Sequence, residues 1–155
     1  MKKTAPKPNL SVIKGVKKKL KQIENVLFPT LKEVFTKYNS IIKDANTQKQ
    51  LFDLGQDANA SSLGSYAEST KRIKIRKRQP IDRVTLKDTG AFYENITVTA
   101  NDTEVIIEAS ISYAKWLTKK YGKDILGVQN MFLKDFVLKY VFPELETEIH
   151  KIIAK

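Results

Sequence analysis

The sequence of 155 residues contains no cysteine and a single histidine, His150. Without cysteine, the chain cannot form disulfides, thiolate metal sites or a cysteine nucleophile. A lone histidine in a predicted helix, beside Glu146 and Glu148, is a poor basis for a metal site. We therefore expect no metal and no cofactor, and we interpret His150 as an exposed helix residue.

Long hydrophobic runs are also missing from the sequence. No apolar stretch approaches the roughly 18 residues that a membrane-spanning helix needs, so we expect no membrane partner. The N-terminus, MKKTAPKPNLSVIKG, has two early lysines but no apolar segment behind them, so we expect no export signal.

Negative charge is scarce in the first half of the chain. Residues 1–80 hold 18 Lys and Arg against 6 Asp and Glu, whereas residues 81–155 hold 10 against 11. All of the excess in the net charge of +11 therefore lies before residue 81. This asymmetry predicts an anionic partner or neighbour, such as nucleic acid, a membrane surface or an acidic protein.

The spacing of apolar residues predicts long helices at both ends of the chain. The first helix should either be kinked at Pro29 or consist of two helices in line, because proline removes a backbone donor. Gly55 should end this helical region, and Pro143 should kink or divide the last helix. The length favours one domain. We expect a flexible basic arm at 1–9 and a single α+β domain at 10–155, which is helical at 10–54, a loop and basic segment at 55–80, a turn plus β-hairpin at 81–112, and helical at 113–155.

A two-residue period replaces the helical period in NITVTAN and EVIIEASI. It places Ile96 and Val98 on one side of the first strand, and Val105 and Ile107 on one side of the second. The fold class is therefore α+β. We expect the long N-terminal helix and the C-terminal helices to pack on a small antiparallel sheet built around this β-hairpin.

The stretch LKDTGAFY could be a catalytic triplet or a structural turn. Asp82 and Asp88 could form an acid–base pair, but neither lies beside a histidine. The DTG triplet occurs once, whereas aspartic proteases need two carboxylates that share a proton. We interpret the stretch as a turn in which Asp88 or Thr89 caps a short helix and Gly90 takes a positive φ. The residues of this structural turn are Leu86, Asp88, Thr89, Gly90 and Phe92.

Six of the eight residues from 71 to 78 are basic. The pattern fits an edge strand and a short helix equally well. Such a run can neutralise phosphates without reading sequence, since no recognised nucleic-acid motif accompanies it. It can equally face an acidic protein. The residues expected to face DNA or an acidic partner are Lys71, Arg72, Lys74, Arg76, Lys77 and Arg78.

The stretch LGSYAESTKRIKIRKRQPIDRVTLKDTGAFYENITV, followed by SYAKWLTKKYG and a final helix, resembles the tailed-phage virion-morphogenesis and tail-completion proteins. The resemblance covers about two thirds of the chain. Asn95 departs from the family pattern, as do the segment GKDILGVQNMF and the long basic N-terminal helix. The residues that carry the resemblance are Thr70, Leu86, Asp88, Thr89, Gly90, Phe92, Tyr113 and Ala114.

The resemblance implies a non-enzymatic head–tail connector of the phage neck. Such a protein would form a sixfold or twelvefold ring that joins portal or adaptor to tail around the DNA channel. It would be found in the virion, and in the host cytoplasm during assembly. The open hairpin could then form the subunit interface through Ile96, Val98, Val105 and Ile107. The alternatives are a non-specific nucleic-acid-binding protein that uses the 71–78 run, and a hydrolase built around Asp82 and Asp88.

Overall fold

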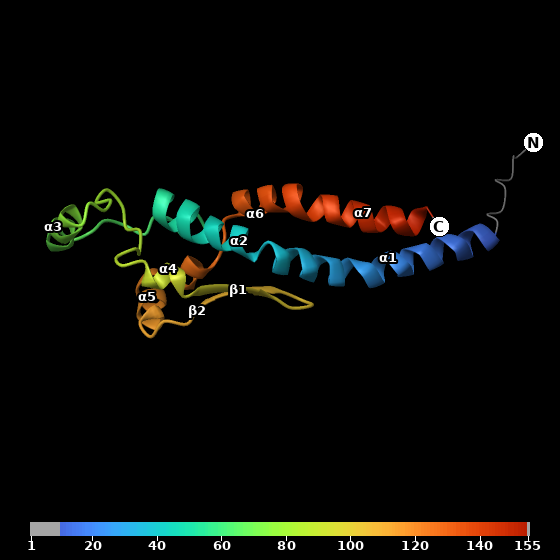
Figure 1. Ribbon diagram of the computed structural model, residues 1–155, viewed down its shortest axis with the longest axis horizontal. Coiled ribbons are helices and arrows are strands. Elements are labelled where there is room, and N and C mark those ends of the chain that lie inside the picture. Colours follow the sequence, from blue (N-terminus) through green and yellow to red (C-terminus); the bar gives the residue numbers. More distant parts are fainter. Residues whose placement is uncertain (1–9, 155) are drawn as a thin grey trace, which may run out of the picture.

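The chain forms an elongated molecule in which helices from the two ends of the sequence lie side by side (Figure 1). A computed structural model describes residues 10–154, with side chains from Ile13 onward. The predicted flexible arm, residues 1–9, lies outside the described residues. The α+β architecture expected from the sequence is confirmed, with a long first helix and one small antiparallel sheet.

The N-terminal helical region is nearly continuous. Helix α1 (Leu10–Lys37) continues through Pro29, and the helical conformation is interrupted only at Tyr38. The helical path then resumes in α2 (Asn39–Asp44) and in the π-helical segment η1 (Ala45–Leu54). Gly55 ends η1 in the left-handed conformation, at φ +62°, as the sequence predicts.

The middle of the chain contains the basic helix and the hairpin. The basic run forms helix α3 (Glu68–Arg76), so the edge-strand alternative is wrong. After a single helical turn, α4 (Ala91–Glu94), the chain enters strand β1 (Ile96–Ala100). Strand β2 (Val105–Ala109) pairs with β1 in antiparallel register, with Val98 opposite Ile107. This hairpin confirms the predicted two-residue period.

The C-terminal region returns to helix. Pro143 lies at the start of the last helix and has no N–H to donate to the carbonyl one turn before it. The preceding turn widens into a π-helical segment, so the hydrogen-bond pattern changes before Pro143 while the backbone stays helical on both sides of it. The elements in order are α5 (Ala114–Tyr121), the 3-10 turn η2 (Lys123–Leu126), α6 (Asn130–Phe136), the π-helical segment η3 (Val137–Val141) and α7 (Phe142–Ile153).

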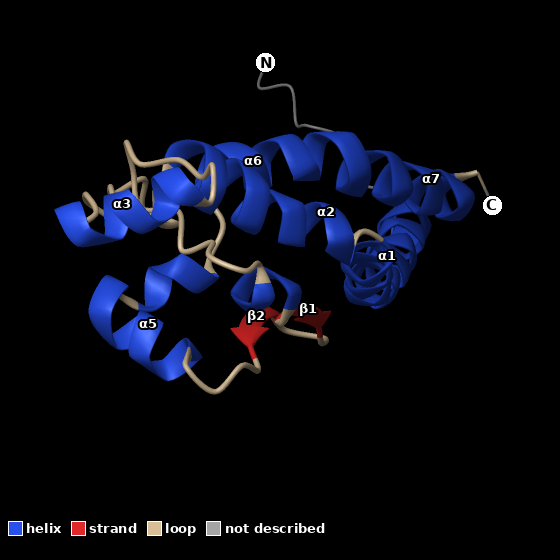
Figure 2. Cartoon of the chain, turned by 60° about the vertical axis from the view of Figure 1, so that its left-hand side comes forward, coloured by secondary structure: helices blue, strands red, loops and turns tan. Residues whose placement is uncertain are grey.

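Strand β1 joins two hydrophobic clusters into one core. Its residue Ile96 is buried in a cluster with Phe92 from α4 and Leu117 from α5. Its residue Val98 is buried in a second cluster with Phe136, near the start of the arm formed by α1 and α7. Ile107 of β2 contacts both clusters. Figure 2 shows the hairpin on one side of the helical layer.

A buried set of amide side chains holds η1 against the segment that precedes α6. The Asn46 amide donates to the carbonyl oxygens of Ile125 at 2.9 Å and Gly127 at 2.7 Å. The Gln50 amide also donates to Gly127 O, and its oxygen accepts the Gln129 N–H at 2.9 Å. A side chain at Gly127 would meet Ala58 at 2.8 Å, so only glycine lets the chain approach this closely. We call Asn46 and Gln50, together with the backbone groups of Ile125, Gly127 and Gln129 that they bind, the amide clamp.

Two glycines give a matched test of the backbone requirement at the end of η1. We expect Gly55→Ala to lower the free energy of unfolding by about 1–3 kcal/mol, because its φ is positive and a Cβ would lie 2.9 Å from Arg83 Cβ. Gly15→Ala, inside α1 with open space around it, should instead raise this free energy by about 0.5–1 kcal/mol. Urea unfolding of both variants measures the difference. Equal effects of the two substitutions would contradict this conformational requirement.

Candidate functional site

A groove of about 620 Å³ lies between α3, the segment 84–89 and α5. Figure 1 shows α3 and α5 toward the end of the molecule that is opposite to the start of α1 and the end of α7. Ile73 of α3 and Trp116 of α5 are large apolar residues in the lining of the groove that remain more than half exposed. We call this surface the α3–α5 groove.

The residues that carry the family resemblance gather around this groove. Five of them line it: Thr70, Leu86, Asp88, Thr89 and Tyr113. The other three, Gly90, Phe92 and Ala114, are buried. Sequence positions more than 40 residues apart are therefore parts of one surface and its support.

The DTG turn has the conformation expected of it but a different cap. Gly90 adopts φ +99° and itself occupies the position before the first residue of α4. The predicted cap position is therefore wrong, because Gly90 occupies it. Thr89 nevertheless accepts a 3.3 Å hydrogen bond from the first N–H of α4, that of Ala91, as expected of a capping side chain. The Asp88 carboxylate pairs with Lys77 at 2.5 Å. The turn thus connects α4 to the basic helix.

Two tyrosines fix the backbone on the way into the turn. The Thr85 N–H donates to the Tyr66 hydroxyl at 2.9 Å, and the Tyr93 hydroxyl donates to the Thr85 carbonyl oxygen. Burial raises the pKa of Tyr93 well above its ordinary value, and the electrostatic influence of Tyr66 and Asp53 adds to this shift. Tyr93 therefore stays protonated and keeps donating its hydrogen bond. Leu86 follows at φ +57°, a conformation that is uncommon for leucine.

Lys74 is a structural residue rather than a free surface charge. Its side chain is buried, with the residue only 5% exposed. The ammonium donates to Lys87 O at 2.8 Å and to Gln79 Oε1 at 3.0 Å, and it lies 4.7 Å from the centre of the Tyr66 ring. These contacts fasten α3 to the segment that leads into the turn. The sequence pattern could not distinguish Lys74 from its neighbours, because burial depends on how α3 packs.

The other members of the basic run divide into paired and exposed residues. Lys77 pairs with Asp88, and Lys71 pairs with Glu68 at 2.7 Å. Arg72, Arg76 and Arg78 are exposed and make no ion pair within the described residues. These arginines are the part of the run available to an anionic partner.

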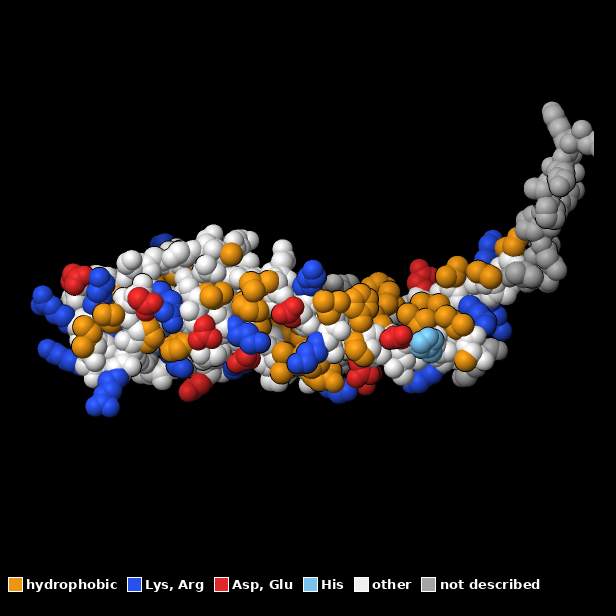
Figure 3. Space-filling model, turned by 90° about the horizontal axis from the view of Figure 1, so that it is seen from above, with side chains coloured by type: hydrophobic (Ala, Val, Ile, Leu, Met, Phe, Trp, Pro, Cys, Tyr) orange, Lys and Arg blue, Asp and Glu red, His pale blue; other side chains and the backbone are white. Residues whose placement is uncertain are grey.

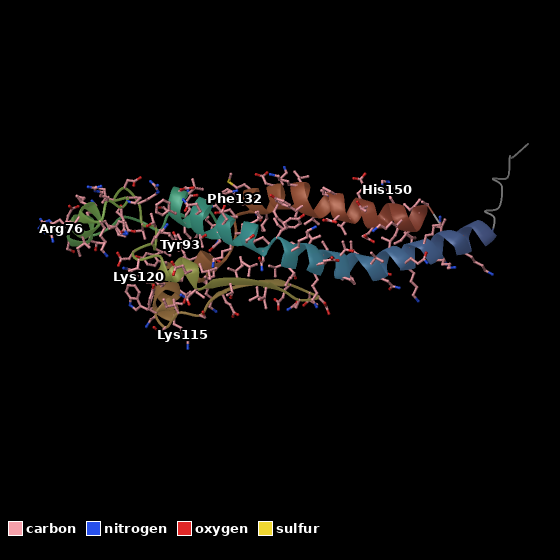
Figure 4. The ribbon with its side chains drawn as sticks, in the orientation of Figure 1. Arg76, Tyr93, Lys115, Lys120, Phe132 and His150 are labelled. Atoms are coloured by element: carbon pink, nitrogen blue, oxygen red, sulfur yellow. The ribbon has the colours of Figure 1, made fainter. Side chains whose placement is uncertain are left out.

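Helix α5 adds charge and aromatic surface that the sequence analysis does not predict. Lys115, Lys119 and Lys120 are exposed on it. Lys120 lies 5.0 Å from the ring centres of both Trp116 and Tyr121, in cation–π geometry. Figure 4 shows Arg76, Lys115 and Lys120 at the same end of the molecule. The motif KWLTKKY carries this signal in the sequence, since its lysines and aromatics alternate around one short helix.

The hairpin residues expected at a subunit interface have different surroundings. Ile96 and Val98 are buried in the core of their own chain, so their side chains are not available to a neighbouring subunit. They point inward because they share a face of β1 and cover the two hydrophobic clusters. Val105 is exposed and Ile107 is half-buried. Only the β2 side of the hairpin therefore presents apolar surface to solvent.

The two carboxylates considered for catalysis each form an ion pair with a different basic residue. Asp82 pairs with Arg83, and Asp88 pairs with Lys77. His150 is exposed on α7, as expected, at the other end of the molecule from α3 (Figure 4). Among residues 10–154, no group of three His, Cys, Asp or Glu side chains is arranged to hold a metal ion. No described helix is long and apolar enough to cross a membrane.

Comparison with profiles of known protein families, with curated proteins and with solved structures gives no match for this chain.

Lys74→Met tests the structural role of the buried lysine. Methionine retains most of the side-chain volume but leaves the Lys87 carbonyl without its donor, so we expect unfolding to require about 1–3 kcal/mol less free energy. Arg76→Met, on the exposed side of the same helix, should change stability by no more than about 0.5 kcal/mol. Urea unfolding followed by circular dichroism measures both. A Lys74 variant as stable as the Arg76 variant would show that these contacts do not hold α3.

Proposed function

We propose that this protein is a non-enzymatic structural component of the neck of a tailed phage. In this role it assembles into a ring that joins portal or adaptor to tail around the DNA channel. One observation carries the proposal: the eight residues of the family resemblance, spread from Thr70 to Ala114, converge on the α3–α5 groove and its buried support. A chance similarity of short motifs gives no reason for this convergence.

The surface of the groove is consistent with binding a protein partner. A wide groove with exposed Trp116 and Tyr113 beside basic side chains has the aromatic and cationic character that is enriched at interfaces. A portal, adaptor or tail protein that presents acidic and apolar side chains would be complementary to it. The protein would then reside in the virion, and in the host cytoplasm while assembly proceeds.

The hairpin offers a second way to join subunits. Its sheet has two strands, and within the described residues β2 pairs only with β1. An unpaired strand edge can accept a strand from a neighbour and extend the sheet. Around a ring, such a contact uses different surfaces on the two partners and closes by rotation.

Assembly with virion proteins tests the proposal. We expect native mass spectrometry and negative-stain imaging to show rings when the portal, adaptor and tail proteins encoded beside its gene are present. Trp116→Ala should weaken binding to one of these proteins by about tenfold or more, because it removes an exposed aromatic from the groove.

The matched control is Met131→Ala, which removes an equally exposed apolar side chain outside the α3–α5 groove. This variant should assemble as the wild type does. A strict monomer that binds no virion component would contradict the proposed function.

Non-specific DNA binding is the second candidate function. The observations that favour it are the three exposed arginines on and after α3 and the exposed lysines of α5. Of these residues, Arg76, Lys115 and Lys120 lie at the same end of the molecule (Figure 4). Contacts of this kind depend on phosphate charge and require no base recognition. Within a neck, the same surface would face the passing DNA.

Salt dependence measures the contribution of the arginines. Replacing Arg72, Arg76 and Arg78 together by alanine should lower DNA affinity and reduce the slope of log K against log salt by about 2.7, at about 0.9 for each lost phosphate contact. Arg83→Ala is the matched control, because this arginine already pairs with Asp82 and donates to Phe52 O at 2.9 Å. Binding of the triple variant with an unchanged slope would exclude DNA contact by these residues.

A further inference from the structure

Helix α7 is amphipathic, yet it contains no buried residue. Its five large apolar side chains are Phe142, Leu145, Ile149, Ile152 and Ile153. A helix with such a stripe ordinarily buries it against the rest of the molecule. Here α7 lies beside α1 in a two-helix arm (Figure 1), and no further helix or strand of the described residues packs along α7.

The contact with α1 uses only one side of the stripe. Two interactions fix the antiparallel pairing: Lys37 with Glu144 at 2.8 Å, and the Lys19 ammonium with the Ile153 carbonyl oxygen at 2.8 Å. The second also satisfies a carbonyl at the end of α7, where a positive charge is favourable. Phe142 and Ile153 remain more than half exposed on the other side.

An open groove follows this uncovered side of α7. Its volume is about 420 Å³. Figure 3 shows hydrophobic side chains gathered along this part of the molecule, next to the single histidine. The groove is lined by Phe142, Leu145, Glu146, Ile149, His150 and Ile153. We call it the α7 groove.

Helix α1 has an exposed apolar ridge that is complementary to the α7 groove. Val16 is 53% exposed and Leu20 is 59% exposed, and they lie one helical turn apart. The sequence places both on the apolar stripe of α1, but the hairpin and α7 do not cover them. Ile149 and Ile153 of the groove have the same spacing of one turn, so ridge and groove match in period.

The charges of the two helices are also complementary. From residue 10 to 37, α1 has seven lysines and two glutamates, whereas α7 has three glutamates and one lysine. Lys17 and Lys21 are exposed beside the ridge on α1. Glu146 lines the groove and makes no ion pair within the described residues. The two surfaces therefore attract each other in both apolar and electrostatic terms.

We propose that the α7 groove receives the Val16–Leu20 ridge of α1 from a second copy of this chain. The contact buries the apolar stripes that one arm leaves open, by completing a helical bundle from the arms of two subunits. It rests on the self-association in the proposed function, but not on a location in the virion. A lipid surface fits less well, because an anionic membrane attracts the lysines of α1 and repels the glutamates of α7.

Self-association of the full chain tests the contact. We expect sedimentation equilibrium to show that Leu20→Glu and Ile153→Glu each weaken assembly by about tenfold or more. Both side chains are exposed, so the subunit fold should survive, and circular dichroism checks it. Ile75→Glu is the matched control, because Ile75 is equally exposed but lies on α3 at the other end.

Charge exchange tests the electrostatic part of the contact. Glu146→Lys should weaken assembly, and adding Lys17→Glu and Lys21→Glu to it should restore at least part of the loss. Failure of this rescue, together with unchanged assembly of the Leu20 and Ile153 variants, would overturn the proposal. Wild-type protein that stays monomeric at all concentrations, or that binds anionic vesicles as a monomer through α1, would also overturn it.

The outcomes for the interface and for the proposed function are distinguishable. Rings that form equally well in the wild type and in the Leu20 and Ile153 variants overturn the α7 groove as the interface and leave the phage role standing. Oligomers that these variants dissociate, but that bind no portal, adaptor or tail protein, support the interface and contradict the phage role.

Discussion

The amide clamp is the constraint on which the rest of the structure depends. It joins η1, from the first third of the chain, to the segment before α6 through hydrogen bonds that no water can replace, since Asn46 and Gln50 are fully buried. Removing the Asn46 amide would take away the donor to the Ile125 carbonyl, and removing the Gln50 amide would take away the acceptor of the Gln129 N–H. The clamp fixes the segment before α6 against η1, and this sets the position at which α6, and then α7, starts along α1. The positions of the arm and of the α3–α5 groove both depend on this contact.

Local patterns in the sequence were sufficient for most of the fold. The two-residue period found the hairpin, and Gly55 and Pro143 marked real boundaries, because backbone conformation and missing donors act within a few residues. The helix–strand ambiguity of the basic run could not be resolved locally. Its α-helical form places Lys74 inward, and that orientation depends on Tyr66 and Lys87, which lie outside the run.

The candidate site was only partly predictable, for the same reason. The DTG turn was recognised, but the α3–α5 groove requires α3, the segment 84–89 and α5 to line one cavity, and no spacing rule encodes that arrangement. The alternating pattern of the hairpin alone places Ile96 and Val98 on an apolar face, but it does not say what covers that face. Once two clusters surround β1, the same alternating face becomes the centre of the core. Exposure is a property of the assembled chain, whereas periodicity is local.

The π-helical segment η3 has a consequence for where the surface of α7 faces. A π turn holds one residue more than an α turn, so every position after it is displaced in phase by about 100°. Phe136 before the segment faces the core, whereas the stripe of α7 after it runs partly uncovered along the arm. In an uninterrupted α-helix, Phe136 and Leu145 would face opposite sides, because each residue turns the helix by about 100°. The extra residue of η3 brings Phe136, Val141 and Leu145 to one side, and all three belong to the same hydrophobic cluster. A single extra residue therefore lets the buried face of α6 continue into α7, and it leaves Phe142 and Ile153 outside that face.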